Sequence, residues 1–210
     1  MKQTVDLRFR WAIAGLLLTS FLALLLAPTQ MPASYDWLRH TTSESGAQGI
    51  TGAWLARLGF LLFGLAILWQ TAVLHKIWPM PVRFFLGAFG VFLTAVAAFS
   101  ARPWLPNLPY DPVEDWLHSF AATAMGFAFA LGVGLRWWAR SWEDKRRILD
   151  LTAVAAAVII PLSMSFLPAW DGLLQRAMFA IAYLWYGFEL LADQAKIREE
   201  TTPAVVDPHE

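Results

Sequence analysis

The chain has 210 residues, of which 58% are hydrophobic and 15% are charged, and its formal net charge is zero. A soluble domain usually carries about 25% charged residues, so this composition indicates a membrane protein. The lack of net positive charge argues against nucleic-acid binding, and the lack of cysteine excludes disulfides, thiolate metal sites and cysteine nucleophiles.

The first apolar run covers residues 11–27 and ends before Pro28. A basic segment precedes it, which is also typical of a signal peptide. The run is longer than the usual h-region of about 7–15 residues, and no clear cleavage pattern follows. We therefore predict a first membrane helix.

Five more apolar runs follow, and each is long enough to cross a hydrocarbon core of about 30 Å. They cover residues 51–74, 84–100, 112–138, 150–167 and 172–192. Residues 194–210 are charged and contain two prolines, which predicts a disordered tail. The fold class is thus all-α, a polytopic bundle of six membrane helices formed by residues 1–193.

Lysine and arginine predict the orientation of this bundle. They concentrate in the N-terminus, the 75–83 link, the 136–147 turn and the tail. The opposite side has only Arg39, Arg57, Arg102 and Arg176. By the positive-inside rule, both termini are cytoplasmic and the 28–50 loop lies outside.

The fourth run begins with a group of polar residues. Asp111 is suited to cap the helix and Pro112 to its first position, and Glu114 at the third position predicts a capping box. Glu114, Asp115 and His118 are spaced by three and four residues, so they share one face of the helix.

Four polar side chains fall at a similar depth in three spans that start on the outer side. At 1.5 Å per residue they lie about 6–10 Å from the outer helix ends. They are Arg57, His118, Gln175 and Arg176. Ionisable groups inside spans are costly and usually face the bundle or a wet cavity, so we predict a polar layer near the outer surface.

This layer has three interpretations. In the first, Arg57 and Arg176 form an inert ion-pair lock with Glu114 and Asp115. In the second, the arginines hold the phosphate or carboxylate of a lipid headgroup or another small ligand in an outward-facing pocket. In the third, His118 acts with Glu114 or Asp115 as the general base of a lipid-modifying hydrolase or transferase.

A metal site is a weaker possibility, because it needs three or four suitable ligands. His118, His40 and a carboxylate are candidates, but His40 is on a loop and no H-E-x-x-H pattern occurs. We predict no metal and no cofactor. On the inner side, Glu189 and Asp193 share one face of the sixth run, and His75, Lys76 and Arg136 lie at the same surface. Interfacial pairing or snorkelling is expected there.

Residues 40–64, HTTSESGAQGITGAWLARLGFLLFG, resemble the first loop and second helix of the domain of unknown function 998 family, bacterial membrane proteins with about six spans. The similarity extends over most of residues 9–193. It includes a serine–acidic loop (Ser43, Glu44), the acid–histidine opening of the fourth span, and the pair Gln175 and Arg176. Arg57 stands where the family pattern leads us to expect a small polar residue.

The resemblance implies a plasma (inner) membrane location and adds Ser43, Glu44 and Gln175 to the expected ligand-binding residues, but the family has no assigned reaction. A remoter similarity to Frag/DRAM/Sfk-type membrane proteins implies a role linked to lipids. Membrane lipids are therefore the expected partners.

Overall fold

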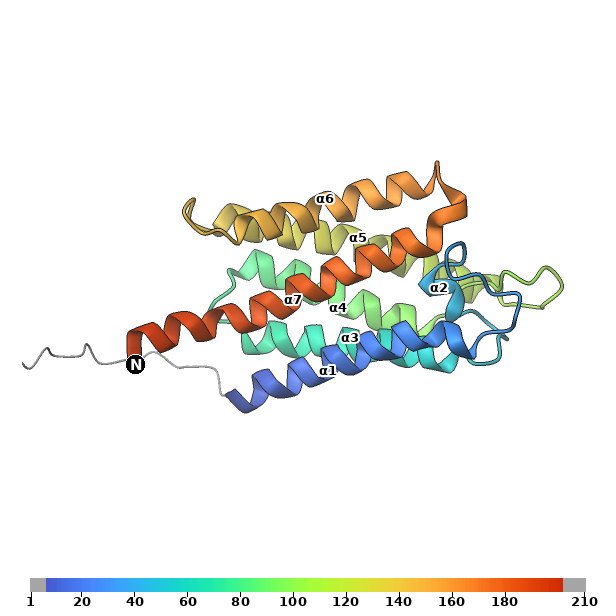
Figure 1. The fold of residues 1–210 in the computed structure, drawn as a ribbon, viewed down its shortest axis with the longest axis horizontal. Helices are drawn as coiled ribbons and strands as arrows, with labels where there is room; N and C mark the ends of the chain where they lie inside the picture. The colour runs from blue at the N-terminus through green and yellow to red at the C-terminus, as the bar shows by residue number, and fades with distance from the viewer. Residues whose placement is uncertain (1–6, 202–210) are drawn as a thin grey trace, which may run out of the picture.

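The computed structural model describes residues 7–201, with side chains up to Leu191. Seven α-helices and two 3-10 helices occur in this range, without a β-strand. Six helices are long and run alternately up and down a bundle (Figure 1). They are α1 (Leu7–Leu26), α3 (Trp54–Val73), α4 (Met80–Ala98), α5 (Pro112–Ala139), α6 (Arg147–Met164) and α7 (Asp171–Thr201).

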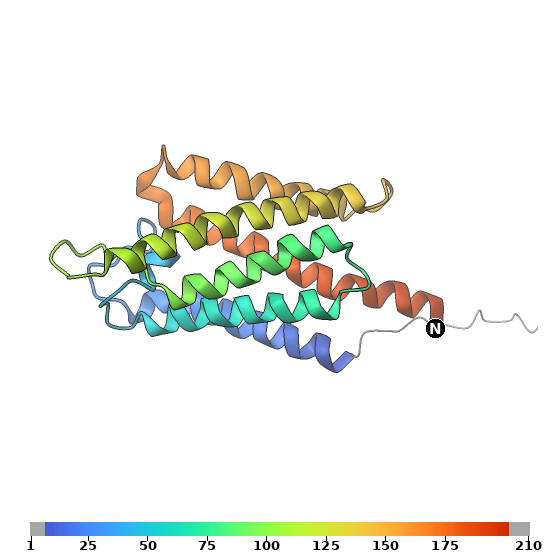
Figure 2. The same ribbon diagram turned by 180° about the vertical axis from the view of Figure 1, so that it is seen from behind.

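The two ends of the bundle differ. The end that we call the terminal end contains the first turn of α1, the short 74–79 and 140–146 connections and the last turns of α7 (Figures 1 and 2). The opposite end, which we call the loop end, contains η1 (Ala27–Gln30), the single-turn helix α2 (Thr42–Ser45), the 99–111 connection and η2 (Pro168–Trp170). The candidate site lies at the loop end.

The long helices form a closed ring in which each packs against its neighbours along the chain. Aromatic side chains fill its centre: Phe89 of α4 lies 5.3 Å from Phe129 of α5 and 5.6 Å from Tyr186 of α7, measured between ring centroids. Such pairs add specific contacts to the large apolar area that they bury. Tyr186 is fully buried, so α7 is an integral part of the core.

The ring closes where α1 meets α7. The Ser20 hydroxyl lies 2.5 Å from the Tyr183 hydroxyl and donates to the Gly59 carbonyl of α3 at 2.6 Å. Nearer the terminal end, Arg10 donates to the Leu190 carbonyl at 2.6 Å. Polar contacts therefore fix the relative position of the first and last long helices.

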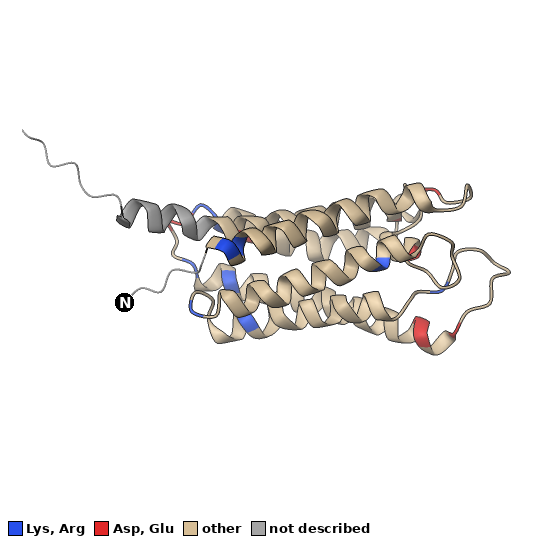
Figure 3. Cartoon of the chain, turned by 90° about the horizontal axis from the view of Figure 1, so that it is seen from below, with Lys and Arg blue, Asp and Glu red and all other residues tan. Residues whose placement is uncertain are grey.

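The chain is a polytopic helical membrane protein. Within the part of the chain that the structure describes, five helices are long and apolar enough to cross a membrane: α1 with η1, α3, α4, α5 and α6. The sixth predicted span lies in α7, which carries Gln175, Arg176 and Glu189 and is not among the five. Figure 3 shows that the charged residues gather toward the two ends of the bundle, with uncharged residues between them.

Several helix boundaries differ from those predicted, and α1, for example, begins at Leu7 rather than at 11 and α3 at Trp54 rather than at 51. Helix α4 begins at Met80 rather than at 84, because Pro79 and Pro81 suit the start of a helix. Helix α6 begins at Arg147 rather than at 150. Helix α7 continues to Thr201, past residue 193 where the tail was predicted to begin, and residues 202–210 of that tail lie outside the described residues.

Helices α3 and α4 approach each other closely at a glycine. A Cβ added to Gly64 would clash with the Thr94 hydroxyl and lie 2.9 Å from the Gly90 carbonyl oxygen. In α5, by contrast, a Cβ added to Gly126 would meet nothing within 4 Å. The two glycines therefore have different roles, although both lie in membrane helices.

We expect Gly64→Ala to lower the stability of the protein by about 1–3 kcal/mol, because the added methyl group forces two helix backbones apart. The matched variant Gly126→Ala should be neutral or stabilise by up to about 1 kcal/mol, since alanine restricts the unfolded chain. Thermal unfolding in detergent measures both. Equal midpoints for the two variants would contradict the close contact at Gly64.

Candidate functional site

The loop between α1 and α3 folds over the loop end around α2. The Thr41 hydroxyl accepts a hydrogen bond from the Glu44 N–H at 3.1 Å, and the Glu44 carboxylate accepts one from the Thr41 N–H at 2.6 Å. This reciprocal arrangement is a capping box. It fixes Ser43 and Glu44, two of the predicted ligand-binding residues, in one local conformation.

Two arginines from long helices hold this loop by its backbone. Arg57 of α3 donates to the carbonyls of Gly46 and Ala47 at 2.9 and 3.0 Å. Arg176 of α7 donates to the carbonyls of Trp37 and His40 at 2.7 and 2.9 Å. The ion pairs predicted between these arginines and Glu114 or Asp115 are therefore wrong, since none occurs in the described part of the chain and the guanidinium groups bind loop carbonyls instead.

Tyr35 strengthens the attachment of the loop. Its hydroxyl accepts a hydrogen bond from Arg176 at 2.6 Å and donates to the Thr41 carbonyl at 3.0 Å. Burial raises the pKa of this hydroxyl, although the neighbouring Arg176 guanidinium acts in the opposite direction. Tyr35 therefore remains a neutral donor that links Arg176 to the start of α2.

The start of α5 agrees only in part with the prediction. Asp111 caps the helix by accepting a hydrogen bond from the Val113 N–H at 2.8 Å, and Pro112 occupies the first turn, as expected. The predicted capping box with Glu114 is wrong. The Glu114 carboxylate instead accepts a hydrogen bond from the Ser100 N–H at 2.7 Å, which ties α5 to the end of α4.

Glu114, Asp115 and His118 all bind the short segment that follows α4. Asp115 accepts a hydrogen bond from the Arg102 N–H at 2.8 Å, next to the contact of Glu114 with Ser100. His118 Nδ1 lies 2.8 Å from the Phe99 carbonyl oxygen. The three side chains thus share one helix face, as predicted, and anchor three nearby backbone groups.

The contact with Phe99 defines the state of His118. A carbonyl oxygen only accepts, so Nδ1 must carry a proton and donate it. When the ring is neutral, Nε2 then has a free lone pair, and this nitrogen makes no hydrogen bond within residues 7–191. The side chain is only 5% exposed. It is therefore a buried imidazole whose orientation is fixed by the contact of Nδ1 with Phe99.

His118 lies in the wall of a cavity of about 590 Å³, which we call the His118 pocket. Ser43, Glu44, Asp115, Arg102 and Trp104 also line it, together with Thr41, Ala101, Pro103, Leu105, Pro106, Leu108 and Tyr110. The loop and the opening of α5 therefore meet around one space, and four of the predicted site residues surround it.

The other predicted residues lie elsewhere. Arg57 and Glu114 line a second cavity of about 490 Å³, together with Gln48, Gly49, Pro109, Tyr110 and Asp111. Gln175 accepts a hydrogen bond from the Ser43 N–H at 3.2 Å and so supports the loop, as Arg176 does. The single polar layer predicted from depth is thus divided between two cavities and a set of loop contacts.

His40, the second histidine considered for a metal site, belongs to an aromatic cluster. Its ring stacks on Trp104 with 5.1 Å between centroids, and its Nδ1 accepts a hydrogen bond from the Asp36 N–H at 2.9 Å. Within the described residues, no three histidine, aspartate or glutamate side chains are grouped so that they could hold a metal.

The terminal end contains a buried charge network that the sequence reveals only in part. Glu189 of α7 pairs with Arg136 of α5 at 2.9 Å, as expected, and also with Arg140. Arg140 pairs with Asp150 of α6 at 2.5 Å. The indole N–H groups of Trp78 and Trp185 donate to Glu189 and Asp150. Arg140 and Asp150 were not predicted to take part. The sequence could have indicated them, because they lie on either side of one short turn between two spans.

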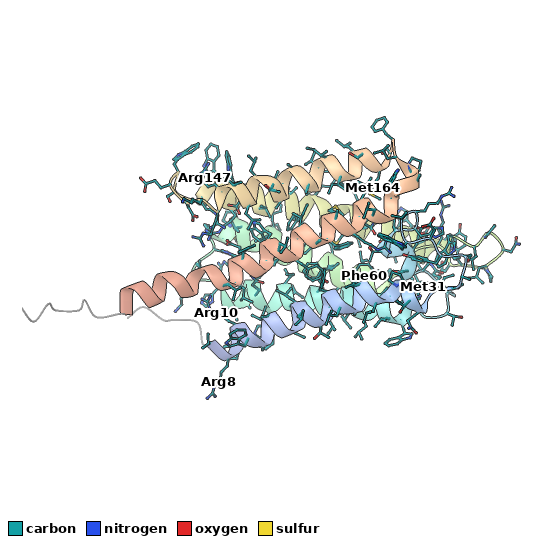
Figure 4. All side chains as sticks on the ribbon, viewed as in Figure 1. Arg8, Arg10, Met31, Phe60, Arg147 and Met164 are labelled. Carbon is teal, nitrogen blue, oxygen red and sulfur yellow. The ribbon has the colours of Figure 1, made fainter. Side chains whose placement is uncertain are left out.

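The turn beside this network is also ordered by arginines. Arg147 lies over the rings of Trp137 and Trp142, 4.4 and 4.0 Å from their centroids, which is a cation–π arrangement. The Arg146 guanidinium binds Asp144 and holds the pKa of that carboxyl well below its usual range. Figure 4 shows Arg147 at the same end as Arg8 and Arg10, with Met31 and Met164 at the other.

We expect Glu189→Gln to destabilise the protein by about 3–5 kcal/mol, because it removes one carboxylate from between two buried arginines. Glu143→Gln, on the exposed 140–146 turn, is the matched control and should change little. Unfolding midpoints in detergent test this. A midpoint for Glu189→Gln equal to that of the control would show that the network contributes no stability.

Comparison with known proteins agrees with the membrane architecture and assigns no activity. No curated protein and no solved structure shows significant similarity to the chain, and the remoter similarity to Frag/DRAM/Sfk-type proteins is not confirmed. Residues 11–188 match the family model described as "Protein of unknown function (DUF998)". This match covers most of the chain, from α1 into α7, and the protein therefore belongs to the DUF998 family.

Proposed function

We propose that this membrane protein binds a small polar ligand in the His118 pocket, with a lipid headgroup as the simplest case. The state of His118 supports this most strongly. The side chain is buried and fixed through Nδ1, and its unbonded Nε2 belongs to a ring in the wall of the cavity. Cavities with a few oriented polar groups are the usual form of small-molecule sites.

The residues have two kinds of role in this proposal. Ser43, Glu44, Asp115 and His118 line the pocket and would contact the ligand. Arg57, Gln175 and Arg176 bind the loop that forms one wall, so they would act by holding its shape. The inert ion-pair layer loses its support, because its ion pairs do not form.

We also propose that the protein lies in the plasma (inner) membrane of a bacterial cell with the pocket facing outward and both termini in the cytoplasm. The support is the distribution of lysine and arginine along the chain. Reporter fusions at Ser43 and Arg147 should therefore report opposite sides, with Ser43 outside. A cytoplasmic signal at Ser43 would reverse the orientation.

The ligand proposal is tested by lipid retention. Protein is reconstituted into vesicles of phosphatidylethanolamine, phosphatidylglycerol and cardiolipin, extracted gently and examined by native mass spectrometry. We expect a bound lipid on the wild type and on Ser119→Ala, which changes an exposed neighbour of His118. We expect its loss from His118→Asn, which preserves a donor to Phe99 but removes the second ring nitrogen. Equal retention by all three proteins would refute the proposal.

The second candidate function is a lipid-modifying hydrolase or transferase, and the orientation of His118 favours it. A base fixed through one nitrogen, with the other free beside a cavity, is suited to accept a proton. Asp115 shares the cavity with His118, whereas Glu114 lies in the wall of the other one. In the same vesicles, catalysis would appear as headgroup or fatty-acid release that His118→Asn lowers by about 10²–10⁴-fold. Retention without release would identify a binding protein.

A further inference from the structure

The charged groups of the His118 pocket show which kind of ligand it suits. Two carboxylates, Glu44 and Asp115, line it, against one cationic side chain, Arg102. Neither carboxylate forms an ion pair within the described residues. Each accepts hydrogen bonds from backbone N–H groups, Glu44 from Thr41 and Asp115 from Arg102. A carboxylate has about four lone-pair positions, so both retain capacity to accept further hydrogen bonds.

The arginines that would reverse this balance are used elsewhere. Arg57 and Arg176 bind loop carbonyls and do not line the pocket. The sequence places these two cations at the level of the site, and on that basis they suit an anionic ligand. The structure reverses this expectation, because the carboxylates remain in the pocket and the two arginines do not.

His118 provides an observation independent of the carboxylates. Its ring is nine-tenths buried, and the Nε2 lone pair has no protein partner within residues 7–191. Nε2 therefore belongs to a ring in the wall of the cavity that the two carboxylates also line, and in the neutral ring it is an acceptor. Trp104 and Tyr110 add aromatic surface to the wall, and aromatic rings attract cations.

We propose that the His118 pocket recognises a ligand that carries an ammonium group. This rests on the proposed ligand-binding function and names its chemical class. An ammonium group has three donors and no acceptor, so it suits a pocket in whose wall Glu44 and Asp115 carry acceptors and His118 carries a further ring nitrogen. Arg102 at the same pocket suits an anionic group next to the amine, so a zwitterionic lipid headgroup or a free zwitterionic amine fits better than a purely anionic one.

The test compares lipids of the same acyl composition in nanodiscs that contain equal amounts of phosphatidylethanolamine and phosphatidylglycerol. Native mass spectrometry of the full chain should show phosphatidylethanolamine retained in preference to phosphatidylglycerol by about tenfold or more, a ratio expected for hydrogen bonds to charged groups. Added ethanolamine separates the two sources. Competition by ethanolamine assigns the free amine, and its failure to compete assigns the lipid headgroup. Either outcome supports recognition of the ammonium group.

Three isosteric variants connect the preference to the pocket. Asp115→Asn and Glu44→Gln retain an oxygen that accepts the backbone hydrogen bonds but remove the negative charge, and glutamine also serves in a capping box. Each should abolish most of the preference. Asp36→Asn is the matched control, because Asp36 also accepts a backbone hydrogen bond, from Leu38 at 3.0 Å, and does not line the pocket. Unfolding midpoints equal to that of the wild type confirm that the variants are folded.

The outcomes separate this inference from the proposal on which it rests. Retention of phosphatidylglycerol in preference to, or equally with, phosphatidylethanolamine overturns recognition of the ammonium group and leaves ligand binding intact. Retention of neither lipid, together with no binding of ethanolamine, overturns the binding function itself. A preference that Asp115→Asn and Asp36→Asn reduce equally would place the recognition outside the His118 pocket and also overturn the inference.

Discussion

The shape of the loop end depends on two arginines that donate hydrogen bonds to backbone carbonyls. Buried or membrane-adjacent backbone groups must be paired, and irregular segments lack the internal pairing of a helix. Arg57 and Arg176 supply donors to four carbonyls of the loop between α1 and α3, and α3 and α7 place them there. The loop is thereby fixed across the bundle, and one wall of the His118 pocket is fixed with it.

The two ends of the bundle use arginine for different purposes. At the terminal end, Arg136 and Arg140 neutralise Glu189 and Asp150 and join α5, α6 and α7 through a buried network. At the loop end, Arg57 and Arg176 bind neutral carbonyls, and Glu44 and Asp115 form no ion pair within the described residues. At the terminal end, the charged groups pair with one another and hold the helices together. At the loop end, the carboxylates lie at a cavity, which is the arrangement expected of a site that recognises a charged group.

Much of the fold follows directly from the sequence, because hydrophobic length and proline positions determine where these helices start and stop. The Asp111 cap and the shared face of Glu114, Asp115 and His118 are local features, and they were predicted correctly. The partners of Arg57 were not predictable in the same way. The position of Arg57 along α3 gives the depth of its side chain. The carbonyls that accept its hydrogen bonds belong to a loop, and the path of that loop depends on α2 and on contacts made by α7. For the same reason, Asp150 resembles an ordinary acid in the first turn of a helix until Arg140 and Trp185 are placed against it.

The contacts between α1 and α7 have a consequence for how the protein is made. Ser20 and Tyr183 are 163 residues apart, and Arg10 and Leu190 are 180 apart, so these contacts form only after nearly the whole chain has been synthesised. The Ser20 hydroxyl also donates to Gly59, only 39 residues away, which allows α3 to hold α1 in the meantime. Distant contacts of this kind form late in folding. Because α7 also carries Arg176, the loop end acquires its final form only when the last helix arrives, and a chain truncated before α7 would enter the membrane without a completed pocket.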